Sequence, residues 1–183
     1  MNNWQDGEPM MRPDELSAFL SYVNAVPPNS TILEYGCGGS TLAMQKILGS
    51  RRLFSVEHNI QWVNRVRPLI TSPNITLVCE PNQLNRQEWL ASGSEVEELS
   101  SGGSRYICAP IVHNKDWDWN NVGLILVDGV ARGACLAWLR KFVSPTTVVL
   151  IHDYTGREYW YAWAAMLYRQ VALTQTLLEL RAD

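Results

Sequence analysis

Short β-rich runs alternate with amphipathic helical runs through most of this chain, and that alternation limits the possible folds more than any other feature. The expected strands cover 31–34, 52–56, 75–79, 122–127 and 147–151, and the expected helices cover 13–26, 40–48, 59–69, 131–142 and 157–166. Strands separated by helices pair in parallel, because each helix returns the chain to the start of the sheet. The continuous apolar run at 122–127 is typical of a strand covered on both faces. We therefore predict an α/β fold with a mostly parallel sheet and helices on both faces.

Two stretches depart from this alternation. Residues 80–121 hold Gly, Ser, acidic residues, Asn and three Trp, so we predict an irregular insertion there, most linker-like at 92–104. Residues 171–181 are rich in Leu and Thr and could form a terminal hairpin or a helix, of which we favour the hairpin. A length of 183 residues is that of one domain, so we predict a single domain over 1–183.

The composition indicates a globular protein and excludes several kinds of partner. Hydrophobic residues make up 46% and charged residues 18%, and the net charge of −3 gives no basic footprint for nucleic acid or an anionic membrane. The four Cys lack the short spacings of zinc or redox sites. We expect a cytoplasmic protein with reduced cysteines, without a signal peptide or a membrane span. The sequence indicates no oligomeric state.

A glycine-rich segment, Glu34-Tyr35-Gly36-Cys37-Gly38-Gly39-Ser40-Thr41, lies between an expected strand and an expected helix. Glycines in this place let a ligand approach backbone N–H groups, although a tight turn without a ligand would use them too. A dinucleotide site would have glycine in place of Thr41, and the Glu34 carboxylate would repel a pyrophosphate. A ligand that carries an amino group would be attracted instead.

Glu57 is a second candidate, because it ends the next strand, 23 residues after Glu34. An acid in this position accepts hydrogen bonds from the two hydroxyls of a ribose. The alternative is a solvated glutamate at a strand end. The glycines and the two acids occur in the order expected for a nucleoside-like ligand.

With these residues, the chain resembles class I S-adenosylmethionine-dependent methyltransferases from about Thr31 to Tyr161. The resemblance implies a three-layer Rossmann-like methyltransferase fold and S-adenosyl-L-methionine as cofactor. It also implies that residues 34–39 wrap the methionine part, that Glu57 binds the ribose and that Glu80 lies near the adenine. The predicted cofactor-binding residues are Glu34, Tyr35, Gly36, Cys37, Gly38, Gly39, Ser40, Thr41, Glu57, His58, Glu80 and Asp128.

Candidate residues for the chemistry follow the fourth and fifth strands, at Asp128 and at His152-Asp153-Tyr154. If the two strands are neighbours, Asp128 and Asp153 lie roughly 5 Å apart and could share one cation. This part resembles metal-dependent O-methyltransferases of the catechol and macrolide-sugar kinds, which implies Mg²⁺ bound by the two aspartates. The chain departs from them in having His152 and Tyr154 where a third acidic or amide ligand would stand.

Each of these residues has a second interpretation. Asp128 could cap a helix, His152 could be a core or capping histidine rather than a base, and Tyr154 could pack instead of lining an acceptor pocket. Arg132 completes a D-G-x-x-R pattern that resembles small bacterial relatives, or it is a surface arginine on a helix. His113 and Trp117-Asp118-Trp119 are expected in a lid or acceptor wall, and His58 beside the cofactor.

The sequence therefore favours transfer of a methyl group from S-adenosylmethionine to a small-molecule acceptor, at oxygen, with Asp128, His152 and Asp153 as catalytic residues. Nitrogen acceptors usually come with an Asn/Asp-Pro-Pro-Tyr motif after the fourth strand, which residues 128–131 lack. A binding module that keeps the cofactor but has lost turnover is the main alternative. A nicotinamide-dependent oxidoreductase fits the glycine loop poorly.

Overall fold

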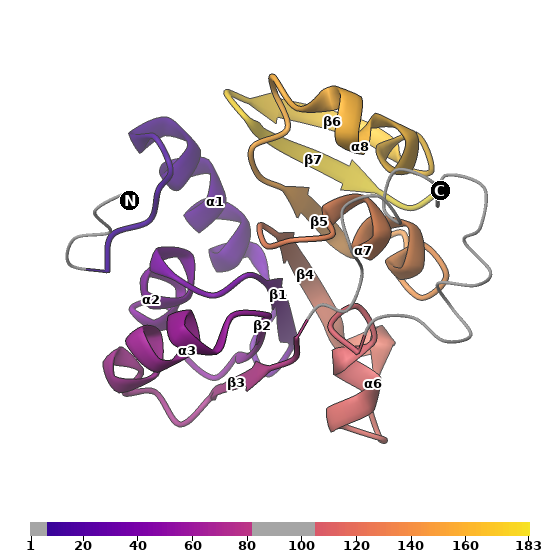
Figure 1. Cartoon of the computed structure of the whole chain (residues 1–183). Helices are drawn as coiled ribbons and strands as arrows, with labels where there is room; N and C mark the ends of the chain where they lie inside the picture. The colour runs from indigo at the N-terminus through magenta and orange to yellow at the C-terminus, as the bar shows by residue number, and fades with distance from the viewer. Residues whose placement is uncertain (1–6, 82–104) are drawn as a thin grey trace.

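The computed structural model describes residues 7–81 and 105–183, which form a seven-stranded sheet in the order β3-β2-β1-β4-β5-β7-β6 (Figure 1). The strands are β1 (Thr31–Tyr35), β2 (Arg52–Glu57), β3 (Ile75–Cys79), β4 (Val122–Val127), β5 (Val148–Ile151), β6 (Arg169–Thr174) and β7 (Leu177–Arg181). The first five strands are parallel, and β7 runs antiparallel to both of its neighbours. The predicted α/β class and mostly parallel sheet are confirmed.

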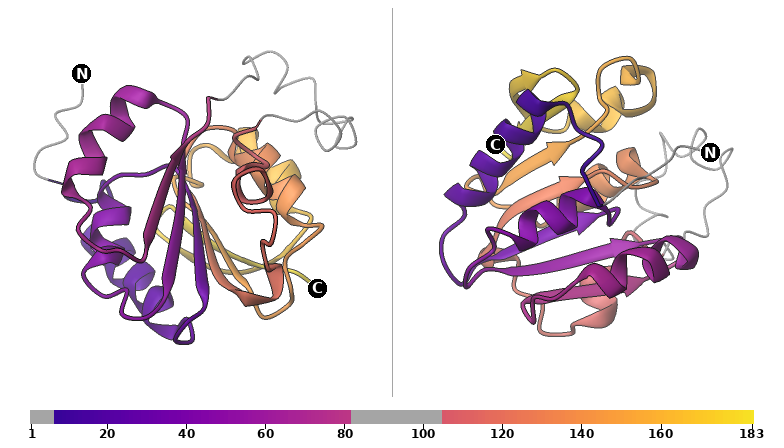
Figure 2. Two further views of the ribbon diagram at one scale, coloured as in Figure 1. Left: turned by 90° about the horizontal axis from the view of Figure 1, so that it is seen from below. Right: turned by 90° about the vertical axis from the view of Figure 1, so that its left-hand side faces the viewer.

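Helices cover both faces of the sheet (Figure 2). One face carries α1 (Pro13–Ala25), α2 (Gly39–Gln45) and α3 (Ile60–Val66), and the other carries α6 (Ala109–His113), α7 (Arg132–Leu139) and α8 (Glu158–Ala165). Short 3-10 turns follow at Arg67–Leu69 and Trp119–Asn121. The three-layer arrangement predicted from the sequence is confirmed.

The core divides into two clusters because side chains of a strand alternate between the faces of a sheet. In β4, Leu124 and Leu126 pack with Phe19 of α1, whereas Ile125 and Val127 pack with Trp138 of α7. These four side chains of β4 are fully buried. The continuous apolar run of this strand is therefore explained by its place in the middle of the sheet, where helices cover both sides.

The parallel register brings the carboxyl ends of four strands to one edge. Tyr35 of β1 is paired with Val56 of β2 and with Val127 of β4, which in turn is paired with Ile151 of β5. The order of the strands reverses between β1 and β4, and this is the position where open α/β sheets bind their ligands. The predicted site residues follow these ends.

The end of the chain forms a hairpin, as favoured from the sequence. β6 and β7 pair antiparallel through a turn at Gln175 and Thr176. The helix after β1 begins one residue earlier than predicted, at Gly39, because the Gly38 N–H donates to Thr41 Oγ1 at 2.9 Å. No helix in the described ranges is long and apolar enough to cross a membrane.

The prediction of irregular structure over 80–121 is wrong for its second half. Residues 105–121 contain α6 and a 3-10 turn, and Tyr106 and Ile107 are fully buried in the core. Residues 82–104, with the most linker-like part, lie outside the described residues.

Trp117 and Trp119 belong to an aromatic cluster and not to a lid. The Trp117 ring is 5.1 Å from Phe54, and the Trp119 ring stacks on Phe142 at 4.9 Å between centroids. Trp117 and Asp118 line a hollow together with Thr31, the first residue of β1, at the edge opposite the carboxyl ends. The expectation that this Trp pair walls the acceptor site is therefore wrong.

Candidate functional site

The glycine loop after β1 touches the loop after β4 through backbone atoms. Gly36 has a φ of +96°, and its N–H donates to the Val56 carbonyl at 2.7 Å. A Cβ atom on Gly36 would lie 2.6 Å from Cα of Gly129, which is closer than side chains can approach. Glycine at position 36 is therefore required by the turn and by the contact, whether or not a ligand is bound.

Glu34 lies beneath this loop and is fully buried. The hydroxyls of Ser40, Thr41 and Ser55 donate to its carboxylate at 2.5, 2.6 and 2.6 Å. Burial raises the pKa of Glu34 to about 7, although the three hydroxyls oppose the shift. The structure thus places the Glu34 carboxylate inside the protein, where it fixes the start of α2 against β2.

Glu57 connects the glycine loop to the loop after β2, and its side chain is almost fully buried. Oε1 accepts hydrogen bonds from the N–H groups of His58 and Asn59 at 2.8 Å each, and Oε2 accepts one from the Cys37 N–H at 3.3 Å. His58 Nδ1 lies 2.6 Å from Oε1, in an orientation that makes no hydrogen bond. The predicted ribose acid is therefore held directly against the predicted cofactor loop.

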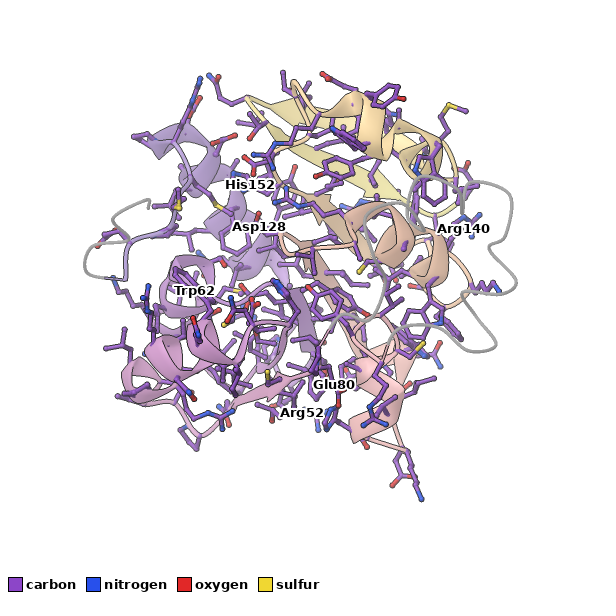
Figure 3. The ribbon with its side chains drawn as sticks, viewed as in Figure 1. Arg52, Trp62, Glu80, Asp128, Arg140 and His152 are labelled. Atoms are coloured by element: carbon purple, nitrogen blue, oxygen red, sulfur yellow. The ribbon has the colours of Figure 1, made fainter. Side chains whose placement is uncertain are left out.

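Trp62 of α3 covers the glycine loop, and sequence reasoning missed it (Figure 3). Its indole N–H donates to the Cys37 carbonyl at 2.6 Å. A Cβ atom on Gly38 would meet only the Trp62 ring, at 3.6 Å or more, so among the described residues the space beside Gly38 is bounded by this indole. The signal in the sequence is an aromatic residue in the first turn of the helix that follows Glu57.

Glu80, expected near the adenine, holds α6 to the end of β3. The Arg105 guanidinium binds its two oxygens at 3.0 Å each, and His113 Nε2 lies 2.7 Å from Oε1. The Arg105 hydrogen bonds outweigh partial burial and lower the pKa of Glu80. His113 was expected in a lid or wall, and the structure instead pairs it with Glu80.

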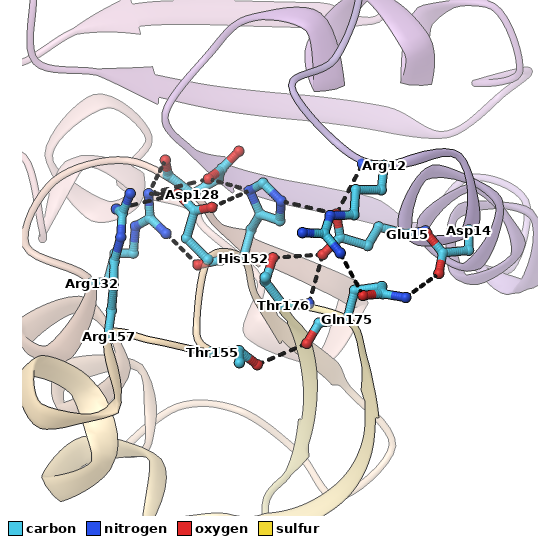
Figure 4. A network of polar contacts seen from close by, with 11 residues as sticks. Arg12, Asp14, Glu15, Asp128, Arg132, His152, Thr155, Arg157, Gln175 and Thr176 are labelled. Atoms are coloured by element: carbon cyan, nitrogen blue, oxygen red, sulfur yellow. Dashed lines mark hydrogen bonds and ion pairs between the residues drawn. The ribbon is translucent and has the colours of Figure 1, made fainter.

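Asp128, His152 and Asp153 come together at the ends of β4 and β5, as predicted. Figure 4 shows Asp128 beside His152. His152 Nδ1 is 2.9 Å from Asp128 Oδ1, and one ligand atom from each residue lies within 4.8 Å of the others. Asp153 has a φ of +54°, which is uncommon for a residue other than glycine. The side chains of Asp128 and Asp153 are 23% and 34% exposed, so both are partly accessible to solvent.

His152 is nearly buried, with 5% of its side chain exposed. Burial acts to lower its pKa, but the hydrogen bond and negative charge of Asp128 outweigh it, so the pKa of His152 is raised. Its other ring nitrogen lies 3.9 Å from Glu15 Oε2 of α1. Glu15 is itself buried and accepts the N–H and the hydroxyl of Thr176. His152 therefore lies behind Asp128, between two carboxylates.

Arg132 is buried at the start of α7 and joins the two aspartate-bearing loops. Its guanidinium donates to the carbonyls of Gly129, Asp128 and His152. One nitrogen, Nη2, also lies 3.3 Å from both Asp128 Oδ1 and Asp153 Oδ2. The surface-arginine interpretation is wrong, and Asp128 is not a helix cap, since Ala131 precedes the first turn of α7.

Tyr106 is the second residue that the sequence did not reveal. It is fully buried, and its hydroxyl finds no hydrogen-bond partner in the described parts of the chain. The hydroxyl lies against Gly129, and the ring lies 6.1 Å from His58. A buried hydroxyl without a partner is unusual and points to a group supplied from outside the described structure.

No protein family and no curated protein matches the sequence, but solved structures do match the fold. A methyltransferase-like protein from Silicibacter pomeroyi is 18% identical, with a TM-score of 0.72 over 97% of this chain and 89% of its own. A TDP-rhamnose 3′-O-methyltransferase of calicheamicin biosynthesis is 14% identical, with a TM-score of 0.59 over 91% of this chain and 76% of its own. The mycinamycin methyltransferase MycE, in complex with Mg, SAH and mycinamycin VI, is 12% identical, with a TM-score of 0.52 over 91% of this chain and 48% of its own. The chain has the class I S-adenosylmethionine-dependent methyltransferase fold.

In this methyltransferase fold the predicted residues share one edge of the sheet. The glycine loop, Glu57 and Asp128 follow β1, β2 and β4, and Tyr154 follows β5 but is buried in the core. The packing interpretation of Tyr154 is thus the one that the structure supports. The fold brings two further residues to this edge, Trp62 and Tyr106, which come from α3 and from the segment before α6.

Proposed function

We propose that this chain binds S-adenosylmethionine at the carboxyl edge of the sheet and transfers its methyl group to an oxygen of a small-molecule acceptor. The observation that carries the proposal is the contact between Glu57 and the Cys37 N–H, which makes the ribose acid and the glycine loop one unit. The Cys37 hydrogen bond is long, at 3.3 Å, so Oε2 of Glu57 can exchange it for a ribose hydroxyl. The cofactor supplies an activated methyl group when bound.

Three further features of the edge fit such a cofactor. The backbone beside Gly38 leaves room bounded by the Trp62 ring, against which a flat base or an aliphatic chain can pack. The Tyr106 hydroxyl, without a partner in the described ranges, can bond to a polar group of a ligand. Glu34 acts indirectly, because it holds the loop through Ser40 and Thr41.

Asp128 is the residue that we assign to the acceptor. It is the partly exposed member of the Asp128–His152 pair, and its carboxylate can orient an acceptor hydroxyl and take its proton. His152 is too deeply buried to touch an acceptor, so it fixes the Asp128 carboxylate from behind. Asp153, 34% exposed, lies beside them. We choose oxygen as the acceptor atom because residues 128–131 lack the Asn/Asp-Pro-Pro-Tyr motif that usually accompanies nitrogen acceptors.

A binding module without turnover is the second candidate, and one observation favours it. Arg132 pairs with both Asp128 and Asp153, so a guanidinium already engages the carboxylates that would have to contact an acceptor hydroxyl. In that case the cofactor would bind without being consumed.

A thermal-shift series followed by a turnover assay tests the proposal. Both S-adenosylmethionine and S-adenosylhomocysteine should raise the melting temperature, because a ligand of the folded state stabilises it, and NAD should not. Incubation with S-adenosylmethionine and metabolite extracts should then convert S-adenosylmethionine into S-adenosylhomocysteine. A shift with both cofactor forms but no release would favour the binding module, and a shift with NAD alone would contradict both candidates.

A further inference from the structure

We propose that Arg132 takes the place of a divalent cation between Asp128 and Asp153, so that this site works without a bound metal. This proposal rests on the proposed function only in assigning the site a role in methyl transfer. The pairing of the two carboxylates with the guanidinium stands on the structure alone (Figure 4).

The Arg132 guanidinium lies between the two carboxylates. Its Nη2 lies 3.3 Å from Asp128 Oδ1 and 3.3 Å from Asp153 Oδ2, so one positive group bridges the two carboxylates. A chelated cation would have to be placed between the same two side chains. Because the guanidinium also donates to three backbone carbonyls of the two loops, it cannot turn away without losing those hydrogen bonds.

Burial makes that position permanent. Arg132 is 7% exposed, and its guanidinium lies 5.7 Å from the Tyr161 ring, within the range of a cation–π contact. A guanidinium stays protonated at any ordinary pH, so its charge cannot be removed to admit a metal ion. A divalent cation would therefore be repelled by a fixed positive charge only a few ångströms away.

A metal ion would also find no third ligand in this cluster. Asp128 Oδ1 is engaged by His152 Nδ1 as well as by Arg132, and Asp153 Oδ2 is engaged by Arg157 as well as by Arg132. A carboxylate only accepts hydrogen bonds, so Nδ1 of His152 must carry the proton and offers no lone pair to a metal. Two arginines already balance the charge of the two aspartates.

The consequence is a different role for the D-G-x-x-R segment. Arg132 fixes the separation and direction of the two carboxylates, which a metal ion does in metal-dependent enzymes. It is thus a positioning residue for Asp128. The Arg157 side chain, 51% exposed, meets only Asp153 of this pair, so it provides a matched control on the same carboxylate.

Titration with Mn²⁺, followed by electron paramagnetic resonance, tests the proposal on the full chain. The wild type should show no saturable Mn²⁺ binding up to about 1 mM, the weak end of protein sites for such hard cations. Arg132→Met should bind one Mn²⁺ at least about tenfold more tightly than the wild type, since the repelling charge is gone. Arg157→Met should bind Mn²⁺ much more weakly than Arg132→Met, because Arg132 still bridges the two carboxylates in it.

The wild type alone can overturn the proposal. One Mn²⁺ bound per chain, and lost in Asp153→Asn, would show that the aspartates chelate a metal despite Arg132, and this holds even if Arg132→Met fails to fold. S-adenosylhomocysteine affinity, measured on the same samples, separates the two proposals. If the folded wild type does not bind S-adenosylhomocysteine, the proposed function is contradicted. The Mn²⁺ titration still tests separately whether Arg132 excludes a metal ion.

Discussion

Gly36 and Gly129 lie in direct backbone contact: a Cβ atom on Gly36 would be 2.6 Å from the Gly129 backbone, and one on Gly129 would be 2.9 Å from the Gly36 nitrogen. The two loops that carry the glycine segment and Asp128 are therefore fixed to each other without any side chain between them. This contact sets the distance between the candidate cofactor and acceptor parts of the site.

The first prediction concerns this contact. Gly129→Ala should lower the free energy of unfolding by about 1–3 kcal/mol, because the added methyl group overlaps the Gly36 backbone and the Tyr106 hydroxyl. Urea denaturation measures the change. Gly49→Asn is the control, since a Cβ there would meet only the Arg51 guanidinium, at an ordinary contact distance of 3.8 Å, and Asn tolerates its φ of +59°. Equal stability of the two variants would show that the loops can separate freely.

The second prediction uses two buried tyrosines. Tyr106→Phe removes a hydroxyl without a partner in the described residues, so the free energy of unfolding should stay constant or rise, by up to about 1–3 kcal/mol. Its affinity for S-adenosylhomocysteine should fall by roughly fivefold, the value of one hydrogen bond.

Tyr35→Phe is the matched variant of the same chemistry. The Tyr35 hydroxyl donates to the Ile107 carbonyl at 2.6 Å, so its loss should lower the free energy of unfolding by about 1 kcal/mol and leave the affinity unchanged. Chemical denaturation and calorimetric titration measure both quantities. Unchanged affinity for S-adenosylhomocysteine in Tyr106→Phe would remove Tyr106 from the candidate site.

The third prediction concerns pH. Burial raises the pKa of Glu34 from 4.5 to about 7 in the folded protein. The folded state then binds this proton more tightly than the unfolded state, so the stability it contributes is present below the unfolded pKa and is lost as the pH rises through 7. From about pH 5 to about pH 8, the wild type should lose on the order of 3 kcal/mol relative to Glu34→Gln. Urea denaturation of both proteins across this pH range measures the difference in their free energies of unfolding. A difference that does not change with pH would contradict the raised pKa of Glu34.

The sequence predicted a mostly parallel sheet and the succession of strands and helices along the chain, because each strand is a short apolar run between turn residues. β4 is the clearest case, since Val122–Val127 is apolar throughout and lies where both faces are covered. It also predicted that Asp128 and Asp153 meet, because the ends of neighbouring parallel strands share an edge.

The rest depends on contacts between segments far apart in the chain. α6 is only five residues long, and the burial of Tyr106 before it comes from packing against Tyr35 of β1. Glu15 reaches His152 because the hairpin turn at Thr176 holds its carboxylate at the start of α1. No periodicity or spacing within one segment carries such information.

Calorimetric titration with S-adenosylhomocysteine tests the central claim most directly. The wild type should bind one molecule per chain, and Glu57→Gln, which keeps the shape but not the charge of the side chain, should lose about 1.5–3 kcal/mol of binding free energy, or roughly 10- to 150-fold in affinity. Glu158→Ala, an exposed glutamate on α8, should bind like the wild type. No binding by a folded wild type, or equal affinity in Glu57→Gln, would contradict a cofactor site at this edge of the sheet.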